Sequence, residues 1–224
     1  MKKLVIFGAG QVAQLAHFYF THDSEYEVVA FTVDRDHLTT HSFCGLPVVP
    51  FEEVEQWYPP AEFCMFIGVA YGDLNKIRAF KYQQAKEKGY FLASYISSKA
   101  ATWQNGQPGA PRIGDNCFIL ENQVIQPYCT IGNNVILWSG NHIGHHSSIG
   151  DHCFLASHIV ISGNVTVEPY CFIGVNATVC HNLTVGQESI IGAGALVTRN
   201  VASHSLYKVK GTLPDERKSN QIIL

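Results

Sequence analysis

The chain has 224 residues, of which 46% are hydrophobic and 15% are charged. This composition is typical of a folded globular chain and excludes an intrinsically disordered one. The formal net charge of −3 gives no electrostatic reason to expect nucleic acid as a partner. No apolar run reaches the roughly 20 residues of a membrane helix, and the apolar start at 4–7 is cut short by Gly8 without a cleavage signal. We therefore expect a cytoplasmic protein that binds neither nucleic acid nor membranes.

Residues 1–103 alternate between strand-like and helix-like segments. Strands are predicted at 4–7, 27–33, 47–50, 63–67 and 91–96, and helices at 11–21, from 51 onward and at 75–88. Such alternation predicts an α/β domain with a small parallel sheet, a Rossmann-like half. Residues 104–112, rich in Gly, Pro and Asn, are predicted to be a linker.

After the linker, every sixth residue from Ile113 to Val197 is aliphatic, at fifteen positions in one unbroken phase. A six-residue period with an aliphatic first residue is typical of a parallel β-helix, in which three hexapeptides make one triangular coil. Residues 18 apart then stack, and the fifth residue of each hexapeptide also faces inward. This position explains four of the seven cysteines as packing residues: Cys117, Cys129, Cys153 and Cys171. We predict a β-helix over 113–202 and a tail over 203–224.

A glycine-rich loop at 8–13, with the pattern GxGxxA, follows the first strand and precedes the first helix. Such a loop points backbone N–H groups and a helix N-terminus at phosphates, although a tight structural turn gives the same pattern. The domain is too short for the second half of an NAD-binding fold, so a nucleotide-sugar pyrophosphate is the favoured ligand. The candidate substrate contacts are Gly8, Gly10, Gln11, Asp34, Arg35 and Gly68.

The densest polar cluster of the repeats is 138–146, which ends in His145 and His146. Histidine is the natural general base near neutral pH, and acyl transfer to an amine or hydroxyl group calls for one. We take His145 as the candidate base, His142 as its rival and Asn141 as a candidate substrate contact. Gly163 lies 18 residues after His145 and is predicted to stack over it.

The alternative roles for the histidines are a structural role in the turns and metal binding. His146, His152 and His158 occupy the fourth hexapeptide position, where we expect exposed turns, and His152 and His181 are expected to be structural. Histidines five residues apart, the spacing of the trimeric zinc hydratases of this fold, do not occur in the repeats. We therefore expect no metal.

On these residues the chain resembles the sugar-nucleotide acetyltransferases of the hexapeptide-repeat superfamily, the PglD-like and NeuD-like enzymes. The resemblance rests on the sequence at 5–10, the unbroken repeats, and the motifs at 143–146 and 191–195. It implies a left-handed β-helix, a homotrimer with active sites between subunits, acetyl-CoA as co-substrate, and a UDP- or dTDP-sugar in the first domain.

The resemblance also implies residue roles. His145 aligns with the catalytic histidine, and His146 replaces the acidic residue that usually orients it. A second histidine of the family falls at Phe154, and His158 or Asn141 are candidate substitutes for it. The implied acetyl-CoA contacts are Gly163, Val175, Gly192, Ala193 and Gly194, with Lys208 and Lys210 near the CoA phosphates. Arg199, Arg217 and Lys218 complete that basic cluster, which is equally consistent with a solvated tail.

The sequence thus predicts transfer of acetyl from acetyl-CoA to the amino group of a dTDP- or UDP-linked 4-amino-4,6-dideoxy sugar, in bacterial surface-glycan (lipopolysaccharide or O-antigen) synthesis. The alternatives left open are an O-acetyltransferase acting on a sialic-acid-type sugar, a zinc hydratase of the β-helix class, and a non-catalytic binding protein.

Overall fold

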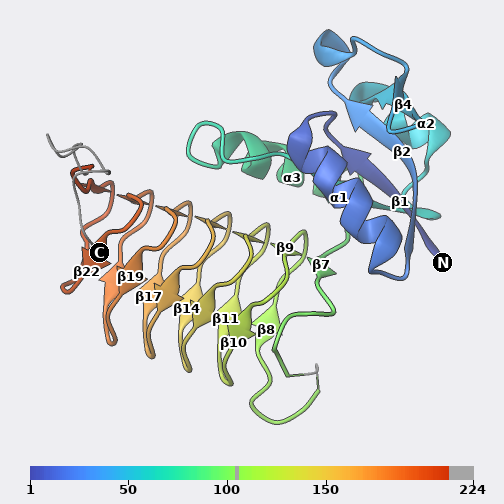
Figure 1. Cartoon of the computed structure of the whole chain (residues 1–224). Coiled ribbons are helices and arrows are strands. Elements are labelled where there is room, and N and C mark those ends of the chain that lie inside the picture. The colour runs from blue at the N-terminus through green and yellow to red at the C-terminus, as the bar shows by residue number, and fades with distance from the viewer. Residues whose placement is uncertain (104–105, 212–224) are drawn as a thin grey trace, which may run out of the picture.

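The computed structural model describes residues 1–103 and 106–211. An α/β domain lies at the start of the β-helix and leans along its first coils, with α3 reaching furthest along it (Figure 1). Among the described residues, no helix combines the length and the hydropathy needed to cross a bilayer.

The α/β domain holds one six-stranded sheet in the order β3-β4-β2-β1-β5-β6, parallel except for β3. Central β1 buries Leu4, Val5 and Ile6 on both faces, which explains its continuous apolar run. The strands are β1 (Lys2–Phe7), β2 (Tyr26–Val33), β3 (Ser42–Phe43), β4 (Leu46–Pro50), β5 (Phe63–Ile67) and β6 (Phe91–Leu92), and the α-helices are α1 (Gln11–His22), α2 (Val54–Trp57) and α3 (Lys76–Glu87). Short 3-10 turns cover Arg35–His37 and Phe51–Glu53. The predicted parallel sheet is confirmed.

The β-helix consists of two-residue strands stacked into three parallel sheets. Face I contains β8 (Arg112–Ile113), β11 (Thr130–Ile131), β14 (Ser148–Ile149), β17 (Thr166–Val167) and β20 (Thr184–Val185). Face II contains β7 (Tyr95–Ile96), β9 (Phe118–Ile119), β12 (Ile136–Leu137), β15 (Phe154–Leu155), β18 (Phe172–Ile173), β21 (Ile190–Ile191) and β23 (Leu206–Tyr207). Face III contains β10 (Val124–Ile125), β13 (His142–Ile143), β16 (Val160–Ile161), β19 (Thr178–Val179) and β22 (Leu196–Val197). Each predicted hexapeptide supplies one strand, and the left-handed parallel β-helix is confirmed.

One expected strand was wrong. Residues 91–96 form two strands in different sheets, because β6 pairs with β5 whereas β7 pairs with β9 of the β-helix. The β-helix therefore starts at Tyr95, before the linker. An isolated bridge between Ala101 and Val124 continues that first partial coil. At the other end β23 pairs with β21, so the expected tail begins as a further strand.

The turns between faces share one conformation. The fourth residue of the hexapeptide is left-handed, with φ of 56° at Asn134, 60° at His146 and 62° at Tyr170. The cysteines at the fifth position are buried and free, as predicted. We name the three rows of turns edge I/II, edge II/III and edge III/I after the faces that they join.

The α/β domain covers face II and edge I/II. Arg78 of α3, which is fully buried, donates to the backbone carbonyls of Asn134 (3.2 Å), His152 (3.1 Å) and Cys153 (3.2 Å). It also donates to the Ala70 carbonyl and to Asn75 Oδ1. Burial lowers the pKa of this guanidinium to about 10, so it stays charged at neutral pH. Carbonyl oxygens, without a carboxylate, therefore hold the charge at the domain seam.

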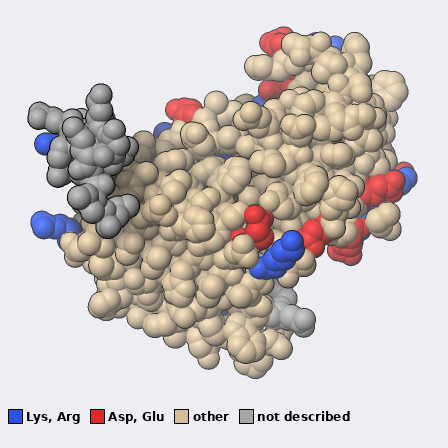
Figure 2. Space-filling model, in the orientation of Figure 1, with Lys and Arg blue, Asp and Glu red and all other residues tan. Residues whose placement is uncertain are grey.

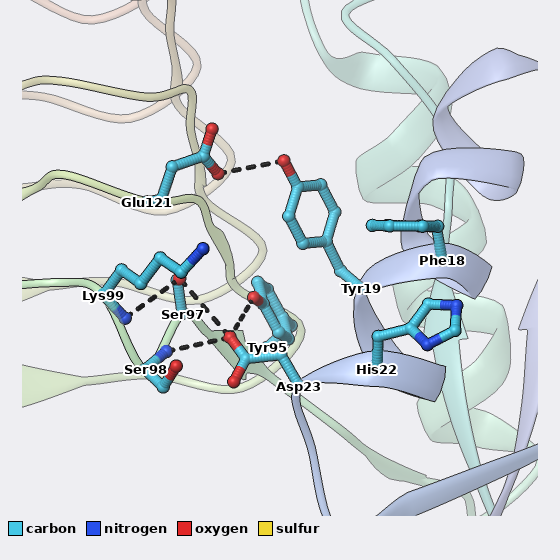
Figure 3. Close-up of a pocket in the computed structure, with 9 residues that line it drawn as sticks. All are labelled: Phe18, Tyr19, His22, Asp23, Tyr95, Ser97, Ser98, Lys99 and Glu121. Atoms are coloured by element: carbon cyan, nitrogen blue, oxygen red, sulfur yellow. Dashed lines mark hydrogen bonds between the residues drawn. The ribbon is translucent and has the colours of Figure 1, made fainter.

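A second part of the seam lies between α1 and the first coil, around a cavity of about 550 Å³ (Figure 3). Tyr19 donates its hydroxyl to Glu121 over 2.9 Å, and Tyr95 donates to Asp23 over 2.6 Å. The Asp23 carboxylate also accepts the Ser98 N–H. Hydrogen bonds to these two carboxylates outweigh burial and lower their pKa values. Both acids thus join the two domains.

Candidate functional site

His145 and His146 lie on edge III/I, where the chain turns from β13 into β14. Both side chains are exposed, and their Nδ1 atoms lie 3.1 Å apart, within hydrogen-bond distance. The His146 ring stacks on Tyr128 of the preceding coil, with centroids 4.7 Å apart and planes inclined by 22°. The two imidazole rings therefore contact each other directly, although His146 replaces the acidic residue implied by the family resemblance.

The backbone around His145 fixes where its ring can go. Its N–H donates to Gln126 Oε1 over 2.8 Å, which anchors the turn to the preceding coil. In the following coil, a Cβ atom on Gly163 would lie 2.6 Å from Cε1 and 2.8 Å from Nε2 of His145. Only glycine leaves room for the ring at this position. Gly163 therefore does stack against His145, as the 18-residue spacing predicted.

The neighbouring candidates occupy different surroundings. His142 lies in β13, half-exposed on face III between Val124 and Val160. Asn141 is 1% exposed, donates to the Trp138 carbonyl and accepts the Ile159 N–H through Oδ1. One end of that buried amide closes its own turn and the other is bonded to the next coil, so these contacts account for Asn141 without a ligand.

His152 differs from the exposed turn residue that we expected. It lies half-buried on edge I/II, packed against Tyr82 and Tyr170. Its Nδ1 atom lies 2.9 Å from Asn134 Nδ2, an amide nitrogen that can only donate. Burial lowers the pKa of His152, which agrees with a neutral ring that accepts through Nδ1. Its predicted structural role fits these contacts, while its predicted exposure was wrong because α3 packs on this edge.

His158 lies on edge II/III, where its ring covers Gly140. A Cβ atom at Gly140 would lie 2.6 Å from His158 Nδ1. This edge is separated from edge III/I by face III, so His158 does not join His145 within one chain. Phe154 packs between Tyr71 and Phe172 on face II, again away from edge III/I.

The glycine-rich loop lines a cavity of about 390 Å³ at the carboxyl ends of β1 and β2. This is the edge of an open parallel sheet where ligands bind. Gly10 is the N-cap of α1, and a Cβ atom there would meet nothing within 4 Å. Gly8 and Asp34 lie in the same cavity, so the structure brings these three candidates together.

The remaining candidates of this domain do not line the cavity. Gly68 packs against α1, where a Cβ atom would lie 3.0 Å from the Cα of Ala13. Gln11 is exposed in the first turn of α1, and Arg35 forms an ion pair with Glu53 on the surface. Close packing thus accounts for the glycine at 68 without a ligand.

Lys81 also lines this cavity, although no sequence pattern marked it as a site residue. Its Nζ lies 2.6 Å from Asp34 Oδ1, only 12% of its side chain is exposed, and the Phe7 and Phe51 rings lie about 5.5 Å away. His37 and Thr39, just after β2, also line the cavity. A cation beside the phosphate-sized space at the α1 terminus is chemically suited to an anionic ligand.

The expected acetyl-CoA contacts fall on two edges. Gly163 lies on edge III/I, whereas Val175, Gly192, Ala193 and Gly194 lie on edge II/III. Val175, Ala193 and Gly194 are exposed, and Gly192 packs under the Tyr207 carbonyl. Lys208 and Lys210 follow β23 and are exposed, as is Arg199, while Arg217 and Lys218 lie outside the described residues. A single molecule that touches all of these residues must either span face III of one chain or lie between two chains, at the border of their face III surfaces.

The glycine-loop cavity and the His145–His146 pair lie on opposite sides of the β-helix. The α/β domain packs on face II, and edge III/I is the edge of the triangular prism opposite that face. One chain therefore does not bring its glycine-rich loop to its own His145. Within residues 1–103 and 106–211, no cluster of three or more His, Cys, Asp or Glu side chains could hold a metal ion.

The comparisons with known proteins agree with this architecture. Residues 110–145, 128–163 and 164–199 match the model of the bacterial transferase hexapeptide family (six repeats). Among curated proteins, none gives a significant match.

Solved structures extend the likeness over both domains. PerB from Caulobacter crescentus, crystallised with CoA and GDP-perosamine, is 25% identical, with a TM-score of 0.78, over 93% of this chain and 97% of that one. The acetyltransferase domain of PglB from Neisseria gonorrhoeae is 24% identical, with a TM-score of 0.80, over 92% and 96%. WeeI from Acinetobacter baumannii, at 18% identity and a TM-score of 0.67 over 91% and 94%, shares the fold.

Proposed function

We propose that the protein transfers acetyl from acetyl-CoA to the amino group of a nucleotide-linked sugar, because residues 110–199 match the model of the bacterial transferase hexapeptide family. The observation that carries the proposal is the exposed ring of His145, with Nδ1 engaged by His146 and Nε2 beside the bare backbone of Gly163. PerB, a perosamine N-acetyltransferase seen with CoA and GDP-perosamine, supports the reaction class.

The reaction is a direct transfer. The amine nitrogen attacks the thioester carbon, the C–S bond breaks and the CoA thiolate leaves. His145 Nε2 takes the proton that nitrogen sheds and can return it to the thiolate. A neutral amine is already nucleophilic, so positioning contributes alongside the base. The tetrahedral oxyanion requires a donor, for which backbone N–H groups of the edge are suited.

The glycine-rich cavity is the proposed acceptor site. Gly8, Gly10 and the N-terminus of α1 suit a pyrophosphate, and Lys81 adds a positive charge beside Asp34. We propose a 4-amino-4,6-dideoxy sugar on dTDP or UDP as the acceptor, with GDP as the nucleotide to compare because PerB was crystallised with GDP-perosamine. Such an acceptor places the enzyme in bacterial surface-glycan synthesis, in the cytoplasm.

A homotrimer would unite the two sites. Face III exposes Val124 (42%), Val160 (38%) and Leu196 (65%), whereas the outward residues of face I are Arg, Thr and Ser. Much of the β-helix surface in Figure 2 likewise shows few charged side chains. Packing face III against a second copy brings edge II/III of one chain beside edge III/I of the next. Val175 and Ala193 of one copy then lie with His145 and Gly163 of another along one groove for acetyl-CoA.

A thiol-release assay with acetyl-CoA tests the reaction, using dTDP-, UDP- and GDP-linked 4-amino sugars as acceptors. We expect turnover on at least one of them, and a fall in kcat on the order of 100-fold in His145→Asn. No CoA release with any acceptor would refute the reaction, and full activity of the variant would refute the base. Activity on sugar hydroxyl groups alone would favour O-acetylation.

Binding of the nucleotides tests the acceptor site separately. Ligand binding raises the apparent melting temperature of the native state, so UDP, dTDP or GDP should stabilise the wild type. Gly10→Ala, whose Cβ meets no protein atom within 4 Å, should keep the fold and lose this stabilisation. Gly8→Ala is the structural control, because φ is +113° and the Cβ would lie 2.9 Å from the Gly68 carbonyl oxygen. An unchanged shift in Gly10→Ala would exclude the glycine loop as the binding site.

A further inference from the structure

The two Nδ1 atoms of His145 and His146, 3.1 Å apart, share a single hydrogen bond. An imidazole nitrogen either donates or accepts, so one of the two carries the proton and the other offers its lone pair. If His145 Nδ1 carries it, His145 Nε2 is free to accept a proton from the substrate. If His146 Nδ1 carries it, His145 holds its own proton on Nε2 and cannot act as a base there. The reaction therefore depends on which tautomers the pair adopts.

We propose that His146 is a positioning residue, a neutral acceptor that fixes His145 in the Nδ1–H tautomer and leaves Nε2 free for the acceptor amine. This inference rests on the proposed acetyl transfer. His146 must then carry its own proton on Nε2. The lone pair on His146 Nδ1 accepts the hydrogen bond from His145 Nδ1–H, as a carboxylate does in a histidine–acid pair. Unlike a carboxylate, it adds no negative charge.

The surroundings hold the His146 ring in the required plane. Tyr128 stacks on it at 22°, and Tyr128 is in turn fixed by the linker, because its N–H donates to the Gly109 carbonyl over 2.7 Å. A Cβ atom on Gly109 would lie 2.8 Å from the Tyr128 ring, so the loop packs directly on it. The linker thus contacts the histidine pair through one aromatic ring.

Few ionisable groups face the pair. Tyr128 comes from the preceding coil, and Cys129, whose buried thiol donates to the Gly144 carbonyl over 3.1 Å, lies beneath the turn. Gln126 and Gly163 supply the neutral contacts to His145. Among the described residues, the contact between the two Nδ1 atoms is the side-chain hydrogen bond that each ring makes.

The fold tolerates the substitutions that test this. Position 146 is left-handed, and the equivalent positions of other coils hold Tyr128, Tyr170 and Glu188 in the same conformation. His146→Phe therefore keeps a ring on Tyr128 but removes the acceptor. His146→Glu keeps an acceptor and adds a negative charge. Tyr170→Phe, at the equivalent left-handed position on edge I/II, is the matched control.

With acetyl-CoA and an accepted nucleotide amino sugar, His146→Phe should lower kcat on the order of 10- to 100-fold. The KM for acetyl-CoA and the melting temperature should stay unchanged. His146→Glu should keep kcat within a few-fold at neutral pH and move the acid limb of its pH profile upward, since a carboxylate stabilises the imidazolium form of His145. Tyr170→Phe should behave as the wild type. Full kcat and an unchanged pH profile in His146→Phe would overturn the proposal.

Nitrogen-15 NMR of the histidine-labelled wild-type protein provides a readout that needs no substrate. We expect His145 protonated at Nδ1 and His146 at Nε2, assigned by the loss of signals in His145→Asn and His146→Phe. The opposite tautomers would overturn the proposal even if the enzyme is active. Absence of turnover on every acceptor would refute the proposed function, and the tautomers would still be read. Unfolding of His146→Phe would leave this measurement, with His146→Glu for assignment, to decide.

Discussion

Edge I/II and edge III/I of the β-helix are built from the same turn and carry the same residue types. His152 on the first and His146 on the second have φ values of 62° and 60°, and each offers Nδ1 to a neighbour about 3 Å away. On edge I/II that neighbour is Asn134, and α3 covers the turn. On edge III/I it is a second histidine, and the turn is open. The packing partner, rather than the turn itself, separates a structural histidine from a candidate catalytic one.

The largest effect on stability should come from removing the side chain that anchors the α/β domain to edge I/II. Arg78→Met leaves the carbonyls of Ala70, Asn134 and His152 without a donor, and Cys153 keeps only the Ile136 N–H. Each unsatisfied buried group is costly, so the free energy of unfolding should fall by about 3–5 kcal/mol in urea titrations. The control Lys86→Met, which removes an exposed ion pair with Asp115, should cost less than about 1 kcal/mol. Equal losses in the two variants would contradict the role of Arg78.

A smaller effect should distinguish glycines on the two edges. Gly163→Ala pushes the exposed His145 ring, which can rotate away, so kcat should fall about tenfold with almost no loss of stability. Gly150→Ala on edge I/II places its Cβ 2.7 Å from the backbone nitrogen of Pro169. That backbone cannot yield, so the variant should lose stability in thermal unfolding. The opposite pattern, with stability lost in Gly163→Ala and kept in Gly150→Ala, would contradict this difference between the two edges.

The smallest effect concerns the dependence of stability on pH. Burial lowers the pKa of His152, so the unfolded chain binds more protons than the folded one below its ordinary pKa of about 6.5. The contribution of neutral His152 to the free energy of unfolding is then fully present above about pH 6.5, and it decreases as the pH drops below that value. His152→Asn, which suits the left-handed turn as Asn134 does, should flatten that fall in urea midpoints between pH 7 and 5. His146→Asn should retain it, and an identical fall in both variants would rule out His152 as its source.

The repeats made most of the fold predictable from sequence. A six-residue period constrains each residue twice, by the face that it occupies and by the residue 18 positions away, so each strand from β8 to β22 could be predicted. The stacking of Gly163 on His145 followed from the same rule. The first partial coil at Tyr95 escaped prediction because the linker interrupts the period before it is established.

The site was harder to predict because its members meet through packing between elements distant in sequence. Lys81 reaches the glycine-loop cavity from α3, and nothing in the periodicity of that helix marks it. The burial of His152 depends on α3 as well, 70 residues earlier in the chain. Asn141 looked like a ligand contact because polar residues surround it, yet its amide closes its own turn.

The way Arg78 holds the seam has a consequence for mutational tolerance. Its guanidinium, with the Asn75 amide beside it, binds backbone carbonyls in three successive coils, from Asn134 to Cys171. Every residue type offers that carbonyl, so these hydrogen bonds survive side-chain changes in the turns that carry them. The side chains of Asp115 and Asn116 on the same edge, which bond Lys86 and the Ile67 N–H, are constrained instead. In a trimer, the docking angle of the α/β domain decides how far a nucleotide-linked sugar reaches toward the histidine of the adjacent subunit. Positions that bind Arg78 and Asn75 only through their carbonyls can therefore change in sequence without altering the reach of the acceptor.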